Sequence, residues 1–358
     1  MTTVGLTGFG TYVPDGVVTG EEIAAESGIP EEVVVEKMGV VEKRVCPPDA
    51  DHASDMSVAA AEEALADASV DAADVDLLLY HGSEFKDHVV WSAAADVADR
   101  LGAENAFATE SYTLCAGAPI AVRQATAQLQ VAHVDTALLV AASREEDLVD
   151  YGNPDSSFMF NFGSGASAMV LESDPGNGAG PGGGDDPGDD AHPGDRAHAT
   201  VHESAAKTDG SFSRDVVMPA GGSVAPPSEE TVAADEHTLD VPDPDGMKER
   251  LGPVSLPSFL EVADAALERS GFAREDVGFV ALTHMKRSFH ERVLEELGLD
   301  PAEDGCYLDR YGHVQSADQI LAVAEGLERG RIDDGDVVLL LGAGTGYTWA
   351  ASALRWRA

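Results

Sequence analysis

Sulfur is scarce in this chain, which holds three cysteines, Cys46, Cys115 and Cys306, among 358 residues. Three thiols are too few for a disulfide framework, and none belongs to a Cys-x-x-Cys pair of the kind that binds structural zinc. We therefore expect a reducing, cytoplasmic environment and no bound metal. The chain also lacks a run of about 18 apolar residues and a basic stretch followed by an apolar one near residue 1, so we expect neither a membrane-spanning helix nor a signal peptide.

Positively charged residues are also scarce in this chain. Lys and Arg number 22 against 65 Asp and Glu, which gives a formal net charge of −43. This balance excludes nucleic acid as a partner, because phosphate backbones are bound by clustered cations. A surface this acidic repels itself at low salt, whereas molar salt shortens the screening length to ~3 Å. We therefore interpret the surface as halophilic, an interpretation that carries no information about the chemistry.

Amphipathic stretches and buried strands alternate along the chain. Short apolar runs predict strands at 77–83, 136–143 and 164–173. Helical spacing of apolar residues predicts helices at 54–70, 91–101 and 255–271, with Ser54 or Asp55 as the N-cap of the first. Because the order helix, loop, strand recurs in the second half, we predict an internal duplication and an α/β fold.

One segment departs from this pattern. Of the 27 residues from 173 to 199, 18 are Gly, Pro or Asp, and the apolar ones are all alanine. Such a segment buries too little surface to offset the entropy lost on ordering. We predict a disordered surface insertion over 173–200, between an N-terminal half at 1–172 and a C-terminal half at 201–358.

Cys115 stands where a short apolar approach becomes a helix of small residues. A buried free cysteine is ordinarily a small core residue. At a helix N-terminus, however, the unpaired N–H groups and the helix dipole favour the thiolate, which is a nucleophile. The residues around Cys115 leave both interpretations open, whereas Cys46 and Cys306 have nothing beside them that favours a reactive role.

Six segments in a fixed order carry a resemblance to a known family. They are GTYVPDGVVTGEEIA, MGVVEKRV, TLCAGAPIAV, FGSGASAMVLE, TDGSF…MPAGGS and the closing GAGTGYTWAASALRW. Together they resemble the ketoacyl synthase III branch of the thiolase superfamily over nearly the whole chain. Ser164 is a departure, since the family usually has an acidic residue there. The resemblance implies a duplicated, five-layered αβαβα fold of the thiolase-like kind and a homodimer.

The resemblance also assigns a site. Cys115 matches the acyl-accepting cysteine, and His284 in LTHMK matches the catalytic histidine, although Gln-Ala-Asn usually follows it. His313 in YGHVQSAD stands where the family has asparagine. The turn at 344–346 matches the backbone that completes the oxyanion hole, whose donors would be the N–H groups of Cys115 and Thr345. Thioester exchange needs a thiolate that attacks and later leaves, and its oxyanion needs pre-aimed donors.

These assignments predict a 3-oxoacyl thioester synthase of fatty-acid or related lipid metabolism. The acyl group would pass from acyl-CoA to Cys115 and then condense with a malonyl thioester, with loss of CO2. We expect His313 to act in condensation rather than in loading. No permanently bound cofactor is expected, since CoA thioesters are the substrates and the sequence lacks a P-loop or dinucleotide motif. The acidic composition disfavours an acyl carrier protein as partner and favours free CoA thioesters.

Three alternatives stay open. Family members altered at the position of His313 pass the acyl group to an alcohol or amine without condensation. A hydroxymethylglutaryl-CoA synthase needs a catalytic glutamate, for which Glu84 in HGSEFKDH is the nearest candidate. A non-catalytic subunit of a CoA-handling complex is the third alternative. The segments that could contact CoA phosphates contain Arg44, Lys86, Lys207, Arg214, Lys248, Lys286 and Arg287.

Overall fold

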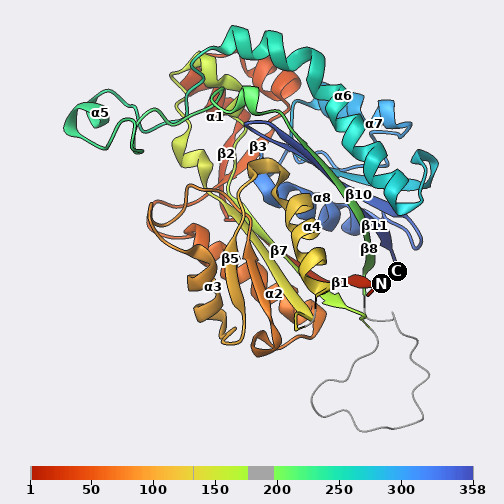
Figure 1. The fold of residues 1–358 in the computed structure, drawn as a ribbon. Coiled ribbons are helices and arrows are strands. Elements are labelled where there is room, and N and C mark those ends of the chain that lie inside the picture. Colours follow the sequence, from red (N-terminus) through yellow and green to blue (C-terminus); the bar gives the residue numbers. More distant parts are fainter. Residues whose placement is uncertain (1, 132, 176–196, 358) are drawn as a thin grey trace, which may run out of the picture.

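The computed structural model describes residues 2–131, 133–175 and 197–357, and a nine-stranded mixed sheet runs through them (Figure 1). The strand order is β5-β4-β6-β7-β1-β8-β11-β10-β9. The bounds are β1 (Val4–Tyr12), β4 (Leu77–Tyr80), β5 (Phe107–Glu110), β6 (Thr136–Ser143), β7 (Gly165–Ser173), β8 (Ala199–Thr208), β9 (Val277–Leu282), β10 (Val337–Gly344) and β11 (Thr348–Trp356). At the centre, β1 and β8 pair antiparallel, with Val4 opposite Val201.

The two halves of the sheet repeat one arrangement. In the first half β4 lies parallel to β6, and β7 runs antiparallel to both β6 and β1. In the second half β9 lies parallel to β10, and β11 runs antiparallel to both β10 and β8. Strands β1 and β8 are therefore counterparts that meet at the middle of the sheet. This arrangement confirms the duplicated α/β fold expected from the sequence.

Three hydrophobic cores lie between the sheet and the helices that pack on it. The helices concerned are α2 (Ala53–Ala68), α3 (Ala93–Leu101), α4 (Gly117–Leu129), α6 (Pro244–Ser270), α7 (Arg287–Leu297) and α8 (Asp318–Glu328). One core joins α2 and α3 to the first half of the sheet, and another joins α6 and α7 to the second. The third core surrounds α4 and α8 and contacts strands of both halves. The order is thus helices, first half of the sheet, helices, second half of the sheet, helices, with α4 and α8 in the middle layer (Figure 1).

Small residues allow these layers to approach closely. A Cβ atom added at Gly8 of β1 would lie 2.4 Å from the carbonyl oxygen of Ala64 in α2. At Gly10 the corresponding distance to the carbonyl oxygen of Ala60 is 2.3 Å. Real side chains do not fit at such distances, so the glycines of β1 and the alanines of α2 set the spacing of the first two layers.

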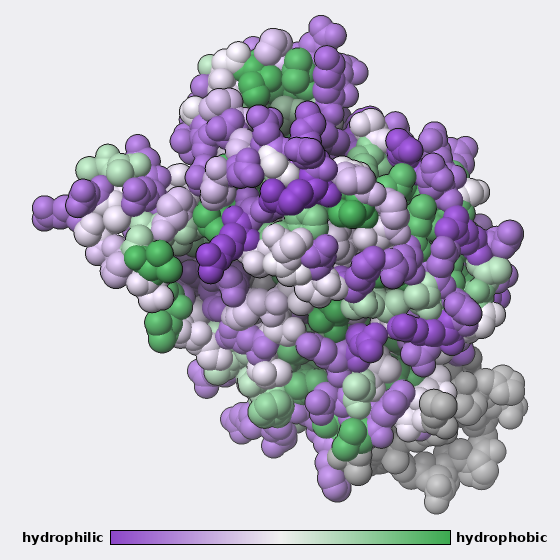
Figure 2. All heavy atoms as spheres, turned by 45° about the horizontal axis from the view of Figure 1, so that its top comes forward, coloured by the Kyte–Doolittle hydropathy of each residue, from purple (hydrophilic) through white to green (hydrophobic). Residues whose placement is uncertain are grey.

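Smaller elements lie outside the nine-stranded sheet and the helices that pack on it. The hairpin of β2 (Gly16–Thr19) and β3 (Glu42–Val45) encloses α1 (Gly20–Ser27), and the sequence pattern did not predict it. The short helix α5 (Glu229–Ala233) lies on an excursion that projects from the body (Figure 1). Hydrophilic side chains cover most of the face drawn in Figure 2, with apolar residues in small groups.

Several predicted boundaries are corrected. Strand β6 has the predicted bounds, but β4 ends at Tyr80 rather than at residue 83. Helix α2 begins at Ala53 with His52 as its N-cap, so the predicted caps are wrong. Asp55 is instead the third helical residue, and its carboxylate accepts a hydrogen bond from the N–H of His52 at 3.1 Å.

The predicted insertion lies mostly outside the described residues, at 176–196. Before it, β7 ends at Ser173, and after it, β8 begins at Ala199. The division of the chain into halves at 1–172 and 201–358 stays a prediction. None of the helices in the described ranges combines the length and the apolar character that crossing a bilayer requires.

Candidate active site

Cys115 lies in the 3₁₀ turn Leu114–Ala116 that leads directly into α4. The preceding Leu114 has a φ of +49°, in the left-handed region that costs a non-glycine residue roughly 1–2 kcal/mol. The carbonyl oxygen of Cys115 accepts hydrogen bonds from Thr283 Oγ1 and Gln319 Nε2, each at 3.1 Å. The cysteine turn is therefore fixed both to the end of β9 and to α8.

A second turn of the same kind faces the first one. The 3₁₀ turn Gln315–Ala317 leads into α8, and Gln315 has a φ of +55°. The two turns touch, because a Cβ atom added at Gly117 would lie 2.6 Å from the Cβ of Ser316. Gln315 Oε1 lies 2.7 Å from Cys115 Sγ and accepts a hydrogen bond from the thiol. The duplication thus brings equivalent turns of the two halves together around the sulfur.

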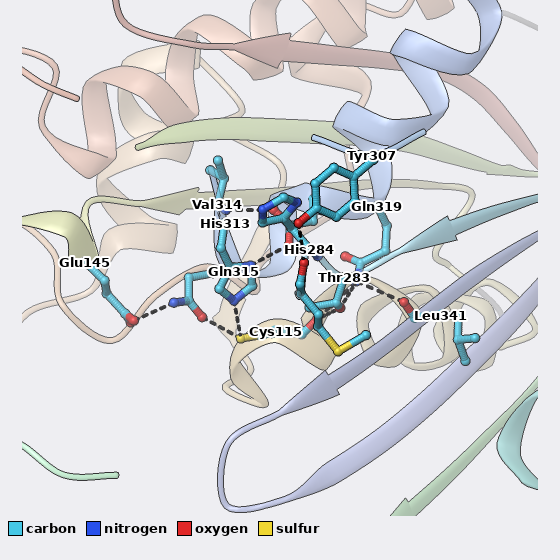
Figure 3. A network of polar contacts seen from close by, with 12 residues as sticks. Cys115, Glu145, Thr283, His284, Tyr307, His313, Val314, Gln315, Gln319 and Leu341 are labelled. Carbon is cyan, nitrogen blue, oxygen red and sulfur yellow. Dashed lines mark hydrogen bonds and ion pairs between the residues drawn. The ribbon is translucent and has the colours of Figure 1, made fainter. Parts of the chain in front are cut away.

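His313 is the second contact of the sulfur. Its Nε2 lies 3.0 Å from Cys115 Sγ (Figure 3). Its Nδ1 lies 2.5 Å from Asp318 Oδ2. The other oxygen of Asp318 accepts from the N–H of Val314 at 2.7 Å. Asp318 is fully buried, and it fixes the imidazole ring in its orientation. Cysteine, histidine and aspartate therefore lie in the order in which a nucleophile, a base and an orienting group stand in a triad, and their catalytic roles stay a prediction.

The charge of His313 follows from these neighbours. Burial acts to lower the pKa of His313, but the carboxylate of Asp318 and the sulfur of Cys115 together raise it well above its ordinary value. These neighbours therefore favour the imidazolium form of the ring when it faces a thiolate. Such a pair keeps the sulfur ready to attack an acyl carbonyl.

His284 follows the end of β9, as predicted, and it enters the same network through its backbone. Its N–H donates to Asp318 Oδ2 at 2.7 Å. Its ring lies against the ring of Tyr307, with centroids 4.6 Å apart, and neither ring nitrogen has a hydrogen-bond partner among the described residues. Burial, with a smaller contribution from the charge of His313, holds the pKa of His284 well below its ordinary value. The ring is therefore neutral and free to bond to a bound substrate, and its catalytic role stays a prediction.

The closing turn of the sheet packs directly on the cysteine turn. A Cβ atom added at Gly344 would lie 1.9 Å from the carbonyl oxygen of Thr113. Burial, together with the charge of Cys115, raises the pKa of Tyr347 in the same turn. Thr345 and Leu114 line one cavity. These contacts place the turn at 344–346 beside the sulfur, and the oxyanion hole of the Cys115 and Thr345 N–H groups stays a prediction.

Glu145 completes the network and was not expected from the sequence. It follows the end of β6, where its Oε2 accepts from Gln315 Nε2 at 2.7 Å and its Oε1 accepts from Ser83 Oγ at 2.5 Å. Burial raises the pKa of Glu145. Gln315 and Asp318 were also missed, although both stand in the segment YGHVQSAD that carries His313.

A cavity of about 1200 Å³ opens from this site. Its lining includes Glu145, Gln315 and Thr345, and also Lys86 and Glu84. Glu84 is exposed, so the carboxylate connected to the sulfur is Glu145 and not the residue that the sequence suggested. The ammonium group of Lys86, from the expected set of phosphate-binding cations, forms an ion pair with Glu110 at 2.9 Å.

Comparisons with known proteins find similarity to ketoacyl synthase III proteins. The family model described as "3-Oxoacyl-[acyl-carrier-protein (ACP)] synthase III" matches residues 110–181, and its "C terminal" counterpart matches residues 267–356. The chain is 27% identical over 356 residues to a beta-ketoacyl-[acyl-carrier-protein] synthase III of Desulfitobacterium hafniense. That alignment covers 99% of this chain and 98% of the relative.

Solved structures show the same fold. A 3-oxoacyl-(acyl carrier protein) synthase III of Pseudomonas aeruginosa superposes with a TM-score of 0.80 at 22% identity, and 99% of each chain is covered. The synthase III of Thermus thermophilus gives 0.78 at 25% identity, with 98% of this chain and 99% of that one covered. OleA of Xanthomonas campestris, solved with lauric acid and lauroyl-CoA, gives 0.77 at 19% identity over 99% of each chain.

Proposed function

Because this chain belongs to the ketoacyl synthase III-like condensing enzymes, we propose that it moves an acyl group from a CoA thioester to Cys115 and condenses it with a malonyl thioester. The observation that carries the proposal is the position of His313, 3.0 Å from the sulfur and 2.5 Å from Asp318. The product is a 3-oxoacyl thioester, which is the kind of intermediate that fatty-acid biosynthesis extends.

The loading step uses all three members of the triad. His313 takes the proton from the Cys115 thiol while Asp318 holds the ring through Nδ1. The thiolate attacks the thioester carbonyl, and the oxyanion forms at the N–H groups of Cys115 and Thr345. The carbon–sulfur bond to CoA then breaks, and the leaving thiolate takes the proton from His313.

The condensation step needs an enolate. The malonyl thioester loses CO2, and the enolate oxygen accepts a hydrogen bond from the ring N–H of neutral His284. His313 donates the second hydrogen bond once its Nε2 has regained from solvent the proton that it gave to the CoA thiolate. The enolate carbon attacks the acyl carbonyl, and the bond to Cys115 breaks. The contact with the sulfur gives His313 a part in loading as well as in condensation, in contrast to the division of roles expected from the sequence.

A second candidate function is acyl transfer to an alcohol or amine. The observation that favours it is the triad itself, because a histidine oriented by a buried carboxylate can remove a proton from an O–H or N–H acceptor. Such a reaction releases no CO2.

Free CoA thioesters are the acyl donors in this proposal, since the acidic composition opposes an acidic carrier protein. We also propose a homodimer. Val89 and Val90 support it, because both are more than 90% exposed and both line the mouth of the cavity. Apolar side chains in such a position are typical of a contact between subunits.

One experiment separates the two functions. Enzyme loaded with an acyl-CoA is incubated with malonyl-CoA labelled in its free carboxyl group, in molar salt, and released CO2 is counted. We expect CO2 and 3-oxoacyl thioester in equal amounts. Acyl-enzyme that forms but releases no CO2, and that is discharged by an added amine or alcohol, would favour the second candidate.

A further inference from the structure

The side-chain amide of Gln315 lies between the nucleophile and a buried acid. Its Oε1 is 2.7 Å from Cys115 Sγ, and its Nε2 is 2.7 Å from Glu145 Oε2 (Figure 3). Gln315 is 2% exposed and Glu145 is 8% exposed. Ser83 Oγ holds the other oxygen of Glu145. The triad described above does not use this second arm of the network.

An amide has one end that donates and one end that accepts. When Glu145 is ionised it only accepts, so Gln315 turns its NH2 group toward Glu145 and its oxygen toward the sulfur. An oxygen facing the sulfur favours the thiol. When Glu145 is protonated it can donate to the amide oxygen, so the NH2 group turns toward the sulfur and favours the thiolate.

We propose that Gln315 is a positioning residue that couples the protonation of Glu145 to the reactivity of the Cys115 sulfur. The proposal rests on the function proposed above, in which the same sulfur attacks one thioester and later leaves another. Both events are favoured when an N–H group faces the thiolate. Glu145 lines the cavity, so it can exchange its proton with solvent there.

The groups around Glu145 determine how readily it takes up that proton. Burial favours its neutral form, and the negative charge of Glu84, which follows β4, acts in the same direction. The hydrogen bond from Ser83 and the positive charge of His313 oppose them and favour the ionised form. The remaining titratable or charged groups near it are Tyr80 on β4, Cys115, and Arg144, Glu146 and Asp147 beside it in the chain. Arg144 is held by Asp147 through an ion pair at 2.6 Å.

The test is the rate at which iodoacetamide alkylates Cys115, measured against pH and located by peptide mass mapping. E145Q imitates the protonated acid, because its NH2 group can donate to the amide oxygen of Gln315. We expect E145Q to react about tenfold faster than wild type above neutral pH, the size of one hydrogen bond gained by a charged group. We expect E145Q to have no such effect in the absence of the amide, so that Q315M and the double variant E145Q/Q315M react at the same rate.

A matched control is E146Q, which makes the same change one residue further along. Glu146 is also buried in part and accepts from the N–H of Cys46 at 3.2 Å, away from Cys115. Its rate should equal that of wild type. Far-ultraviolet circular dichroism and melting curves check folding, and Gln315→Gly, which suits the positive φ at this position, replaces Q315M if that variant unfolds.

Two results would overturn the coupling. One is a rate for E145Q equal to that of wild type at every pH. The other is an equal acceleration by E145Q whether it is introduced into wild type or into Q315M, because a direct effect of charge would not need the amide. Iodoacetamide requires no acyl substrate, so failure of the wild-type enzyme to accept an acyl group would contradict the proposed function without bearing on this measurement.

Discussion

Asp318 accepts hydrogen bonds from three buried donors, the ring of His313 and the N–H groups of His284 and Val314. Replacing it by alanine leaves all three without a partner. We expect D318A to lower the free energy of unfolding by about 3–5 kcal/mol, the range measured when one member of a buried charged pair is removed. Urea unfolding in molar salt measures this loss. D264N, which removes a carboxylate from a partly exposed pair with Arg274, should lower it by less than about 1 kcal/mol.

The pH dependence of stability tests the charge assigned to His313. A histidine whose pKa is higher in the folded than in the unfolded protein stabilises the fold fully below the unfolded pKa of about 6.5. That stabilisation disappears as the pH rises through the folded pKa, which Asp318 and Cys115 raise well above this value. The free energy of unfolding of wild type minus that of H313N should therefore be largest at mildly acid pH and should shrink at alkaline pH. A difference that stays constant or grows with pH would contradict the assignment.

At the residue scale, local sequence could locate Cys115 and His313 but not the groups that surround them. Cys115 is recognisable because its segment leads into a helix of small residues, and His313 because the segment YGHVQSAD resembles that of the family. Glu145 and Gln315 gain their importance from a contact between parts of the chain that are 170 residues apart. No spacing within one segment records such a contact. Asp318 was easier to find than Glu145, because it lies only five residues after His313. The two side chains meet because the chain turns at Gln315, whose φ is positive.

At the element scale, the end of β10 must lie against the cysteine turn for the oxyanion hole to form. Alanine at Gly344 would place a Cβ atom 1.9 Å from the carbonyl oxygen of Thr113, which is backbone and has little room to move. We expect G344A to slow acyl loading at least tenfold, because strain of roughly 1–3 kcal/mol separates the two turns. Stopped-flow release of CoA thiol measures the loading rate.

The control for G344A is G222A. A Cβ atom added at Gly222 meets nothing within 4 Å, and this glycine does not have a positive φ. Its loading rate should match that of wild type. Equal loading by G344A and wild type would show that the closing turn does not take part in the oxyanion hole.

Strands were easier to predict than helix ends. All eight residues of β6 are buried and six of them are apolar, and their sequence alone gives the correct bounds. Helix α6 begins at Pro244, well before the predicted start at 255. Pro253 lies just before that predicted start, and Pro257 lies within the predicted helix. Proline ordinarily ends a helix, so the sequence argues against a continuation that tertiary packing supports. The hairpin of β2 and β3 was missed because its strands are short and far apart in the chain.

At the scale of the whole molecule, the acidic surface should make stability depend on salt. The net charge of −43 produces repulsion that molar salt screens within ~3 Å. We expect the melting midpoint to rise by roughly 10 °C or more between low and molar KCl, where ~1 kcal/mol corresponds to ~2–4 °C. Differential scanning fluorimetry measures the midpoint, and sucrose, which is excluded from protein surfaces but carries no charge, serves as the comparison. An equal rise in sucrose, or none in KCl, would contradict the halophilic interpretation.

The central claim is that Cys115, activated by His313 and Asp318, accepts an acyl group from a thioester. Intact-mass spectrometry after incubation with a panel of acyl-CoAs tests it most directly, with C115A, C46A and C306A compared under the same conditions. Cys115 is 6% exposed and alanine fits its site, so C115A should fold normally. We predict one acyl adduct on wild type, C46A and C306A, and none on C115A. An adduct of the same size on folded C115A would place the nucleophile elsewhere and contradict the account.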